Sequence, residues 1–104
     1  MEKQDAFTQA LLRAMDAAEQ EAGVRQPRLR RAVEQYGGIS AVRELCRRGQ
    51  VSDGFDQLAG LGKLALSAEA LAVSAKFNAC FTDDEVNHCF AQLCAANYFG
   101  AARL

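Results

Sequence analysis

Three cysteines and the only histidine of the chain lie close together in the sequence, a grouping that could hold a metal ion. They are Cys80, His88, Cys89 and Cys94. Zinc ligands usually come in Cys-x2-Cys pairs or three to four residues apart on a helix. On a helix, Cys89 and Cys94 point about 140° apart, and His88 and Cys89 about 100° apart. One regular helix cannot direct them to a single ion, so we predict no metal ligand. The bland interpretation is that these are core, boundary and surface residues.

The same residues do not predict a catalytic site. His88 would have to act as the general base for Cys46 or Cys80, and only tertiary folding could bring it near either thiol. Nucleophilic catalysis also needs an oriented base and an oxyanion site, and no motif in the sequence indicates them. The glycine-rich residues 60–63 lack the first glycine and the Ser or Thr of a P-loop. We therefore predict no enzyme activity, no catalytic residue and no cofactor.

Basic residues are concentrated in the middle of the chain. Seven of the twelve lie between Arg25 and Arg48, where only two acids occur, so this stretch carries a charge of +5. Residues 1–22 and 51–104 each carry −3, which leaves a total of −1. A basic stretch of this kind meets an acidic partner or pairs internally with the acidic flanks. The sequence leaves both alternatives open.

Two short predicted helices joined by Gly37-Gly38 carry this basic stretch and have the outline of a helix-turn-helix. Arginines on their outer faces could contact phosphates or read guanine. The candidates for nucleic-acid contact are Arg28, Arg31, Arg43, Arg47 and Arg48. A solvated helix surface is the favoured interpretation, because the sequence pI of about 5.8 is low for a nucleic-acid-binding domain and two glutamates interrupt the basic face.

Protein–protein association is the function that the sequence favours, with nucleic-acid binding as the alternative. The first predicted helix has a broad face of Ala, Leu and Phe, and the C-terminal tail is apolar. The candidate association surface is Phe7, Leu11, Ala14, Ala18, Tyr98 and Phe99. A homodimer is one form of this hypothesis, since an alanine-rich core gains from further burial. Packing of these segments on the chain's own core is the other interpretation.

The elements that must position these residues are helices. Apolar residues recur at helical spacing in six segments, and no segment shows the sustained alternation of a strand. The segments begin at or near Lys3, Pro27, Ile39, Ser52, Ser67 and Thr82. We predict an all-α fold: a compact, roughly orthogonal bundle of about five to six short helices. Residues 1–104 form a single domain, with an amphipathic helix over residues 1–22 and the rest of the bundle over residues 23–104.

Capping residues place several of these helix starts. Ser52 and Ser67 are expected to cap the fourth and fifth helices, and Glu69 to lie in a first turn, where the helix dipole favours its charge. Thr82 and Glu85 form a predicted capping box, the clearest local signal in the chain.

Helical spacing also predicts a single core cluster. Its expected members are Leu29, Val33, Tyr36, Val42, Leu45, Phe55, Leu58, Leu71, Phe77, Phe81, Phe90 and Leu93.

The N-terminus lacks the basic start and apolar run of a secretory signal. No stretch approaches the roughly 20 apolar residues of a membrane span. We therefore expect a cytoplasmic location, no membrane partner and four reduced cysteine thiols.

Residues 37–85 also carry a recognisable pattern. It reads Gly-Gly-Ile-x-Ala-Val-Arg-x-Leu from Gly37, Val-Ser-Asp-Gly-Phe-x-x-Leu from Val51, Gly-Lys-Leu-x-Leu-Ser-x-Glu-Ala-Leu from Gly62 and Phe-Thr-Asp-Asp-Glu from Phe81. This pattern resembles a small helical segment found in many bacterial proteins of unknown function. The resemblance implies a helical fold and a bacterial source, and it brings no catalytic residues.

Overall fold

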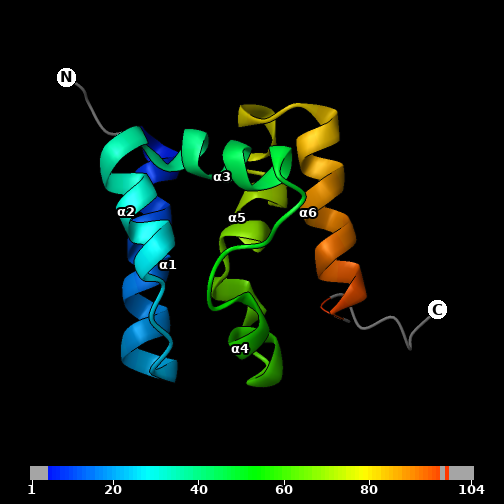
Figure 1. Ribbon diagram of the computed structural model, residues 1–104. Coiled ribbons are helices and arrows are strands. Elements are labelled where there is room, and N and C mark those ends of the chain that lie inside the picture. Colours follow the sequence, from blue (N-terminus) through cyan, green and yellow to red (C-terminus); the bar gives the residue numbers. More distant parts are fainter. Residues whose placement is uncertain (1–4, 97, 99–104) are drawn as a thin grey trace.

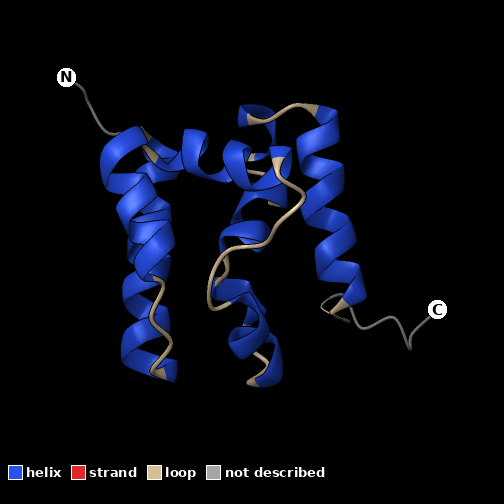
Figure 2. Ribbon diagram, viewed as in Figure 1, coloured by secondary structure: helices blue, strands red, loops and turns tan. Residues whose placement is uncertain are grey.

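The described part of the chain is built from helices alone. The computed structural model describes residues 5–96 and 98, and over these residues it contains no strand (Figures 1 and 2). The predicted all-α class is therefore confirmed. None of the described helices is both long enough and apolar enough to cross a membrane. The α-helices are α1 (Ala6–Ala22), α2 (Pro27–Tyr36), α3 (Gly38–Arg47), α4 (Phe55–Gly60), α5 (Ala68–Val73) and α6 (Asp83–Ala95), and the 3-10 turns are η1 (Leu64–Leu66) and η2 (Asn78–Cys80).

Two predicted caps are confirmed. The Ser67 hydroxyl accepts a hydrogen bond from the Ala70 backbone N–H at 3.1 Å and begins α5. At the start of α6, the Thr82 hydroxyl accepts from the Glu85 N–H at 3.2 Å, and the Glu85 carboxylate accepts from the Thr82 N–H at 2.8 Å. These local interactions fix the helix starts independently of the core.

The predicted cap at Ser52 is wrong. The residue before α4 is Gly54, whose φ of 88° lies in the left-handed region that favours glycine. A Cβ at Gly54 would lie 2.8 Å from Val24 Cγ1 and 3.0 Å from Gln26 Cγ. Both the backbone conformation and the close packing therefore require glycine at position 54. Because Ser52 does not cap α4, its side chain makes a different contact.

Helix α3 crosses the ends of its neighbours instead of running along them (Figure 1). In this view α1 and α2 lie on the left, α5 lies in the middle and α6 on the right. Helix α3 packs on α2 and also touches α1, α5 and α6, while α5 packs on α6. It therefore has one side toward α2 and another toward α6. The radius of gyration, 12.8 Å, is close to the roughly 13 Å of a compact 100-residue domain.

A glycine and a buried threonine seat the start of α3 on α1. The Gly38 N–H donates a hydrogen bond of 2.8 Å to Thr8 Oγ1, and Thr8 is only 2% exposed. A Cβ at Gly38 would lie 3.1 Å from both the Thr8 Cα and the Phe7 ring. Because Gly38 has no side chain, α3 can start directly against α1.

The core forms two adjoining clusters, which corrects the prediction of one. In the first, the Phe7 ring meets the rings of Phe77 and Phe81 edge-on, with centroids 5.4 and 5.1 Å apart. The buried members of the first cluster are Phe7, Leu11, Met15, Leu29, Val33, Ala41, Val42, Ala68, Ala72, Phe77, Phe81 and Cys89. Those of the second are Ala18, Val24, Phe55, Leu58, Leu64, Ala70 and Leu93. Val73 packs against both.

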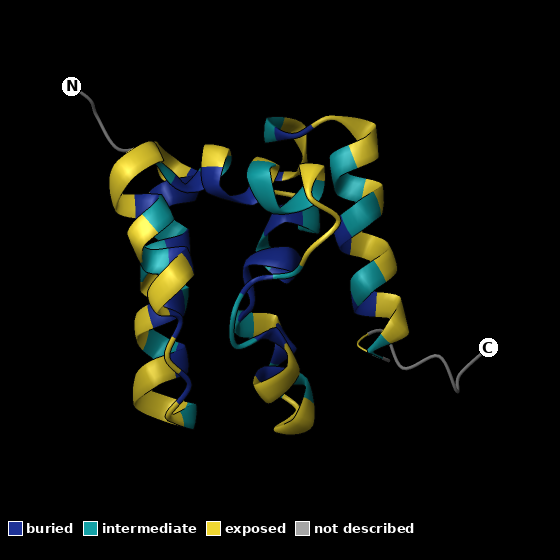
Figure 3. Cartoon of the chain, viewed as in Figure 1, coloured by how far each residue is buried: buried dark blue, intermediate teal, exposed yellow. Residues whose placement is uncertain are grey.

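The apolar face of α1 lies inside this core and cannot serve as the predicted association surface. Phe7, Leu11 and Ala18 are buried, and Ala14 is half-buried. Figure 3 shows the chain coloured by burial. The helical spacing of apolar residues on α1 predicts a contact with another molecule, whereas in the structure the chain's own helices cover this face. Of the two tail residues in that prediction, Tyr98 is exposed and Phe99 lies outside the described residues.

Two residues predicted in the core are exposed: Tyr36 by 68% and Phe90 by 47%. On α6 the buried residues Cys89 and Leu93 are four apart and define the inward face. Phe90 lies about 100° around the helix from Cys89, so its ring falls beside that face. Tyr36 is the last residue of α2, beyond its buried residues Leu29 and Val33, and its side chain borders a groove.

Candidate functional site

A groove with a largely apolar interior runs between α2 and α3, and we call it the α2–α3 groove. Its volume is about 320 Å³, and residues 50–53 form its third side. A space of this size and composition lies in the range of binding pockets. Its less exposed apolar lining residues are Leu29, Ala32, Ala41, Leu45 and Val51, and its exposed lining residues are Arg28, Tyr36, Ser40, Arg48 and Gln50.

A buried glutamate holds the third side of this groove. Glu69 of α5 is 2% exposed, and its carboxylate accepts hydrogen bonds from the Ser52 backbone N–H at 2.7 Å and the Ser52 hydroxyl at 2.8 Å. Burial raises the pKa of Glu69, although the hydrogen bonds from Ser52 and the nearby His88 oppose that shift. Glu69 lies in the first turn of α5 as predicted, and its carboxylate also fixes a distant segment.

The neighbouring residue, Asp53, caps α2 across the groove. Its carboxylate accepts hydrogen bonds from the backbone N–H groups of Arg28 at 2.9 Å and Leu29 at 3.1 Å. The local N-cap residue, Gln26, makes no capping hydrogen bond with its side chain. Asp53 therefore supplies the negative charge that the start of a helix favours. Glu69, Ser52 and Asp53 together connect α5 to α2 through one short segment.

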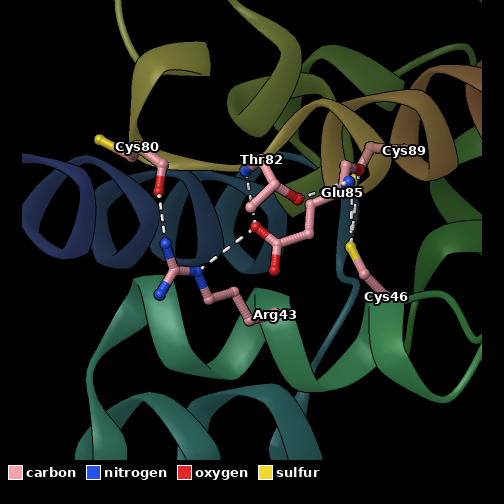
Figure 4. A network of polar contacts seen from close by, with 6 residues as sticks. All are labelled: Arg43, Cys46, Cys80, Thr82, Glu85 and Cys89. Carbon is pink, nitrogen blue, oxygen red and sulfur yellow. Dashed lines mark hydrogen bonds and ion pairs between the residues drawn. The ribbon is translucent and has the colours of Figure 1, made fainter.

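A second, more open groove lies between α3 and the start of α6, and we call it the α3–α6 groove. Its volume is about 510 Å³. Arg43 bridges its two sides: Nε lies 3.4 Å from Glu85 Oε1, and a terminal nitrogen donates to the Cys80 carbonyl oxygen at 3.2 Å (Figure 4). Most of its lining residues are charged, and the full set is Ser40, Arg43, Glu44, Cys46, Arg47, Thr82, Asp84 and Glu85.

Two thiols face each other beneath this second groove. Cys46 Sγ of α3 lies 3.8 Å from Cys89 Sγ of α6 and 3.7 Å from the Glu85 carbonyl oxygen (Figure 4). Cys46 is half-buried, whereas Cys89 is 2% exposed. The hydrogen bond with Cys89 lowers the pKa of Cys46. The same hydrogen bond, together with burial, raises the pKa of Cys89.

The five arginines predicted as nucleic-acid contacts are divided between the two grooves. Arg28 and Arg48 border the α2–α3 groove, and Arg43 and Arg47 border the α3–α6 groove. Arg31 is exposed and lines neither. All five side chains are exposed, but three of them are engaged in ion pairs within the chain.

Glu44 pairs with two of these arginines. Arg47 Nε donates to Glu44 Oε1 at 3.1 Å, and Arg48 Nε donates to Glu44 Oε2 at 2.7 Å. The hydrogen bonds from Arg47 and then Arg48 lower the pKa of Glu44. Among the described residues, no ion pair involves Arg28 or Arg31. The basic surface is thus partly neutralised on α3, and on α2 Arg30 pairs with Asp16, which leaves Arg28 and Arg31 without an ion pair among the described residues.

The cysteines and histidine of the C-terminal region point to different places. His88 Nε2 lies 2.9 Å from the Gln50 carbonyl oxygen, Cys80 is half-buried in η2, and Cys94 is exposed. Cys89 faces Cys46 instead of its sequence neighbours. Over residues 5–96 and 98, no three side chains of His, Cys, Asp and Glu are grouped to hold a metal ion.

Sequence reasoning missed the long-range links of these grooves, of which two are the most informative. Ser52 meets Glu69 across 17 positions, and Cys46 meets Cys89 across 43. The sequence around Ser67 predicts that Glu69 lies in a first helical turn, and it does not indicate that Ser52 is its partner. No periodicity in the sequence pairs Cys46 with Cys89.

Comparisons of the chain with family models, with curated proteins and with solved structures find no match. The resemblance of residues 37–85 to a helical segment of bacterial proteins therefore stays a prediction.

Proposed function

We propose that this protein is a protein-association module that binds a segment of a partner protein in the α2–α3 groove. The segment presents an apolar side chain to the groove and carboxylates to the arginines beside it. One observation carries this proposal: a groove with an apolar interior is bordered by the exposed ring of Tyr36 and by Arg28.

The chemistry of the border favours an acidic partner. Arg28 and Arg31 lie three residues apart on α2, so both reach the same side of the helix. Neither makes an ion pair with another described residue. Carboxylates on the partner would form charge-assisted hydrogen bonds with these guanidinium groups, and the opposite charges would speed association.

Tyr36 is the expected anchor of the interface. Tyrosine and arginine are enriched among the few residues that dominate binding energy, usually beside pockets that a partner fills. Tyr36 is 68% exposed in the free chain, so a partner that covers its ring removes apolar surface from water.

The groove is preorganised for such a partner. Glu69 fixes Ser52, and Asp53 fixes the start of α2, so the third side of the groove is held before binding. Segments that are ordered in the free protein cost less conformational entropy on association. The apolar face of α1, the surface expected to join two copies, is buried in the core, and the partner proposed here is a different protein.

Selection from a random peptide library displayed on phage tests the proposal with the full chain as bait. We expect enriched peptides to share a large apolar residue beside Asp or Glu. Synthetic copies should bind the wild-type protein and lose about tenfold or more in affinity with Tyr36→Ala or Arg28→Glu, the loss that marks a hot spot. Arg13→Glu, at an exposed position of α1, is the matched control and should bind normally.

Two results would contradict the proposal. One is the absence of any enriched sequence, and the other is enriched peptides that bind Tyr36→Ala as tightly as wild type. Circular dichroism of each variant separates lost binding from lost folding. Light scattering of the free chain reports whether a second copy occupies the groove, which would replace the foreign partner with a homodimer.

A second candidate function is binding of single-stranded nucleic acid, which one observation favours. The exposed Tyr36 offers a ring on which a base can stack, and Arg28, which borders the same groove, makes no ion pair with another described residue. Fluorescence anisotropy with labelled single-stranded and duplex DNA over a salt series tests it. Affinity that falls steeply with salt and requires both Tyr36 and Arg31 would support this candidate. No measurable binding at low salt would eliminate it.

A further inference from the structure

The Cys46–Cys89 pair is a cluster of reactive groups that the proposed association function does not use. Its sulfurs lie 3.8 Å apart, on two helices far apart in the sequence (Figure 4). A disulfide bond is about 2.05 Å long, so forming one requires the two sulfurs to approach by less than about 2 Å. Among the described residues, no third His, Cys, Asp or Glu is grouped with them to hold a metal ion. We therefore consider the reactions of the two thiols with each other.

The two thiols differ in access. Cys46 is half-buried and lines the open α3–α6 groove, where a small reagent can approach it. Cys89 is 2% exposed and lies behind it. The guanidinium groups of Arg43 and Arg47 line the same groove. An oxidant from solvent therefore meets Cys46 first, and Cys89 is already positioned within reach of the product.

We infer that Cys46 is a site of oxidation by hydroperoxides, and that Cys89 converts the oxidised residue into an intramolecular disulfide. The Cys46 thiolate attacks the terminal oxygen of a hydroperoxide and becomes a sulfenic acid, while the O–O bond breaks and the other oxygen leaves as an alcohol or water after taking a proton. Cys89 sulfur then attacks Cys46 sulfur and expels hydroxide, which leaves as water with the Cys89 proton. In total, two thiols give two electrons to one hydroperoxide.

The local environment favours Cys46 over Cys89 as the residue that is oxidised first. The reactive form of a cysteine is the thiolate, and the hydrogen bond from Cys89 favours the thiolate of Cys46. Burial of Cys46 acts against the thiolate first, and the negative charges of Glu85 and Glu69 act against it next, so the environment does not produce an extreme nucleophile. Among the described residues, only Cys46 and Cys89 lie with their sulfurs in contact, whereas Cys80 lies in η2 and Cys94 is exposed on α6.

The bond would join α3 directly to α6. It would close a loop between residues 43 positions apart and so restrict the unfolded chain. We expect the oxidised protein to unfold at a higher temperature than the reduced protein. Because this proposal concerns a thiol reaction, it does not rest on the association function and is measured separately from it.

Peptide mapping of the full chain tests the inference. Reduced protein is treated with equimolar hydrogen peroxide, blocked with iodoacetamide, digested and analysed by mass spectrometry. We expect a linked peptide pair containing Cys46 and Cys89, a loss of two of the four free thiols, and full reversal by dithiothreitol. The Cys80→Ser/Cys94→Ser double variant is the matched control and should form the same bond.

Trapping of the intermediate tests the order of the two steps. Cys89→Ala should accumulate a sulfenic acid at Cys46 that reacts with dimedone, whereas Cys46→Ser should lose the intramolecular disulfide. Linkages that mainly involve Cys80 or Cys94, disulfides only between chains, or overoxidation of all four thiols at equal rates would overturn the proposal. The wild-type peptide map decides the question even where a variant fails to fold.

Discussion

The two grooves beside α3 differ in how their sides are held, although Ser40 and Glu44 line both of them. The α2–α3 groove has an apolar interior and depends on a buried carboxylate, Glu69. The α3–α6 groove is lined mostly by charged residues and is bridged by Arg43 and Glu85 in a partly exposed ion pair. Helix α3 thus separates a groove with an apolar interior from an open groove lined mostly by charged residues.

Two glutamates beside these grooves have pKa values shifted in opposite directions. Burial raises the pKa of Glu69, whereas hydrogen bonds from Arg47 and Arg48 lower the pKa of Glu44. The first carboxylate is removed from water and compensated by Ser52. The second remains in solvent, where ion pairs are screened and contribute little. We therefore expect changes at Glu69 to have large effects and changes at Glu44 to have small ones.

Glu69→Leu should cause the largest loss of stability. Leucine removes both acceptors and leaves the Ser52 N–H and hydroxyl buried without partners, at about 1–3 kcal/mol for each group. Glu69→Gln is the matched control, because its amide can accept from the N–H and donate to the hydroxyl. Chemical denaturation should give a much lower free energy of unfolding for the leucine variant alone. Equal losses in the two variants would show that the charge, rather than the hydrogen bonds, holds Ser52.

The pH dependence of stability should report the same carboxyl group. Because the folded pKa of Glu69 is raised, its stabilising contribution is complete below the ordinary glutamate pKa of about 4.3 and is lost as the pH rises through the folded value. The difference in unfolding free energy between wild type and Glu69→Gln should therefore fall with rising pH over that range. A difference that grows with pH would mean that Glu69 is held mainly by positive charge.

Most of the fold was predictable because the signals are local. Gly23 ends α1, Pro27 begins α2, and the Thr82–Glu85 capping box begins α6, each determined by residues within one turn. The failure at Ser52 has a tertiary cause. A serine before a helix can cap it, but here the hydroxyl donates to Glu69 from another helix.

The candidate sites were much less predictable. The exposed arginines were named from sequence, but their division between two grooves depends on how α3 crosses the bundle. Periodicity predicts that Tyr36 lies in the core, because it identifies the apolar face of a helix. It does not show where along that face the neighbouring helix ends, and Tyr36 is exposed. The sequence correctly predicts the apolar face of α1, and in the structure this face packs against other helices of the same chain.

On the α3–α6 side, Thr82→Ala should have a moderate effect. It removes the hydroxyl that accepts from the Glu85 N–H, and loss of such a cap costs about 1 kcal/mol. Thr82→Ser keeps the hydroxyl and is the control. Thermal unfolding of both variants measures the difference. A loss as large as that of Glu69→Leu would show that this exposed cap also supports packing between α3 and α6.

The smallest effect is expected at Glu44. Its pKa is lowered by Arg47 and Arg48, so its contribution is present above the ordinary glutamate pKa and is lost as the pH falls through the folded value, opposite to Glu69. Glu44→Gln should therefore lower stability slightly at neutral pH in low salt. The change should disappear in high salt, because the side chain is exposed and its ion pairs are screened.

The same variant separates the two candidate functions. Glu44→Gln releases Arg47 and Arg48 from their shared partner and makes the surface of α3 more basic. If the chain binds single-stranded DNA, anisotropy should show tighter binding and a steeper salt dependence, since more arginines become available to phosphates. If it binds an acidic, apolar peptide in the α2–α3 groove, the main determinants are Tyr36 and Arg28, and the affinity should change far less than in Tyr36→Ala. A peptide affinity more sensitive to Glu44 than to Tyr36 would move the binding site from the apolar interior of the groove to the charged ridge of α3.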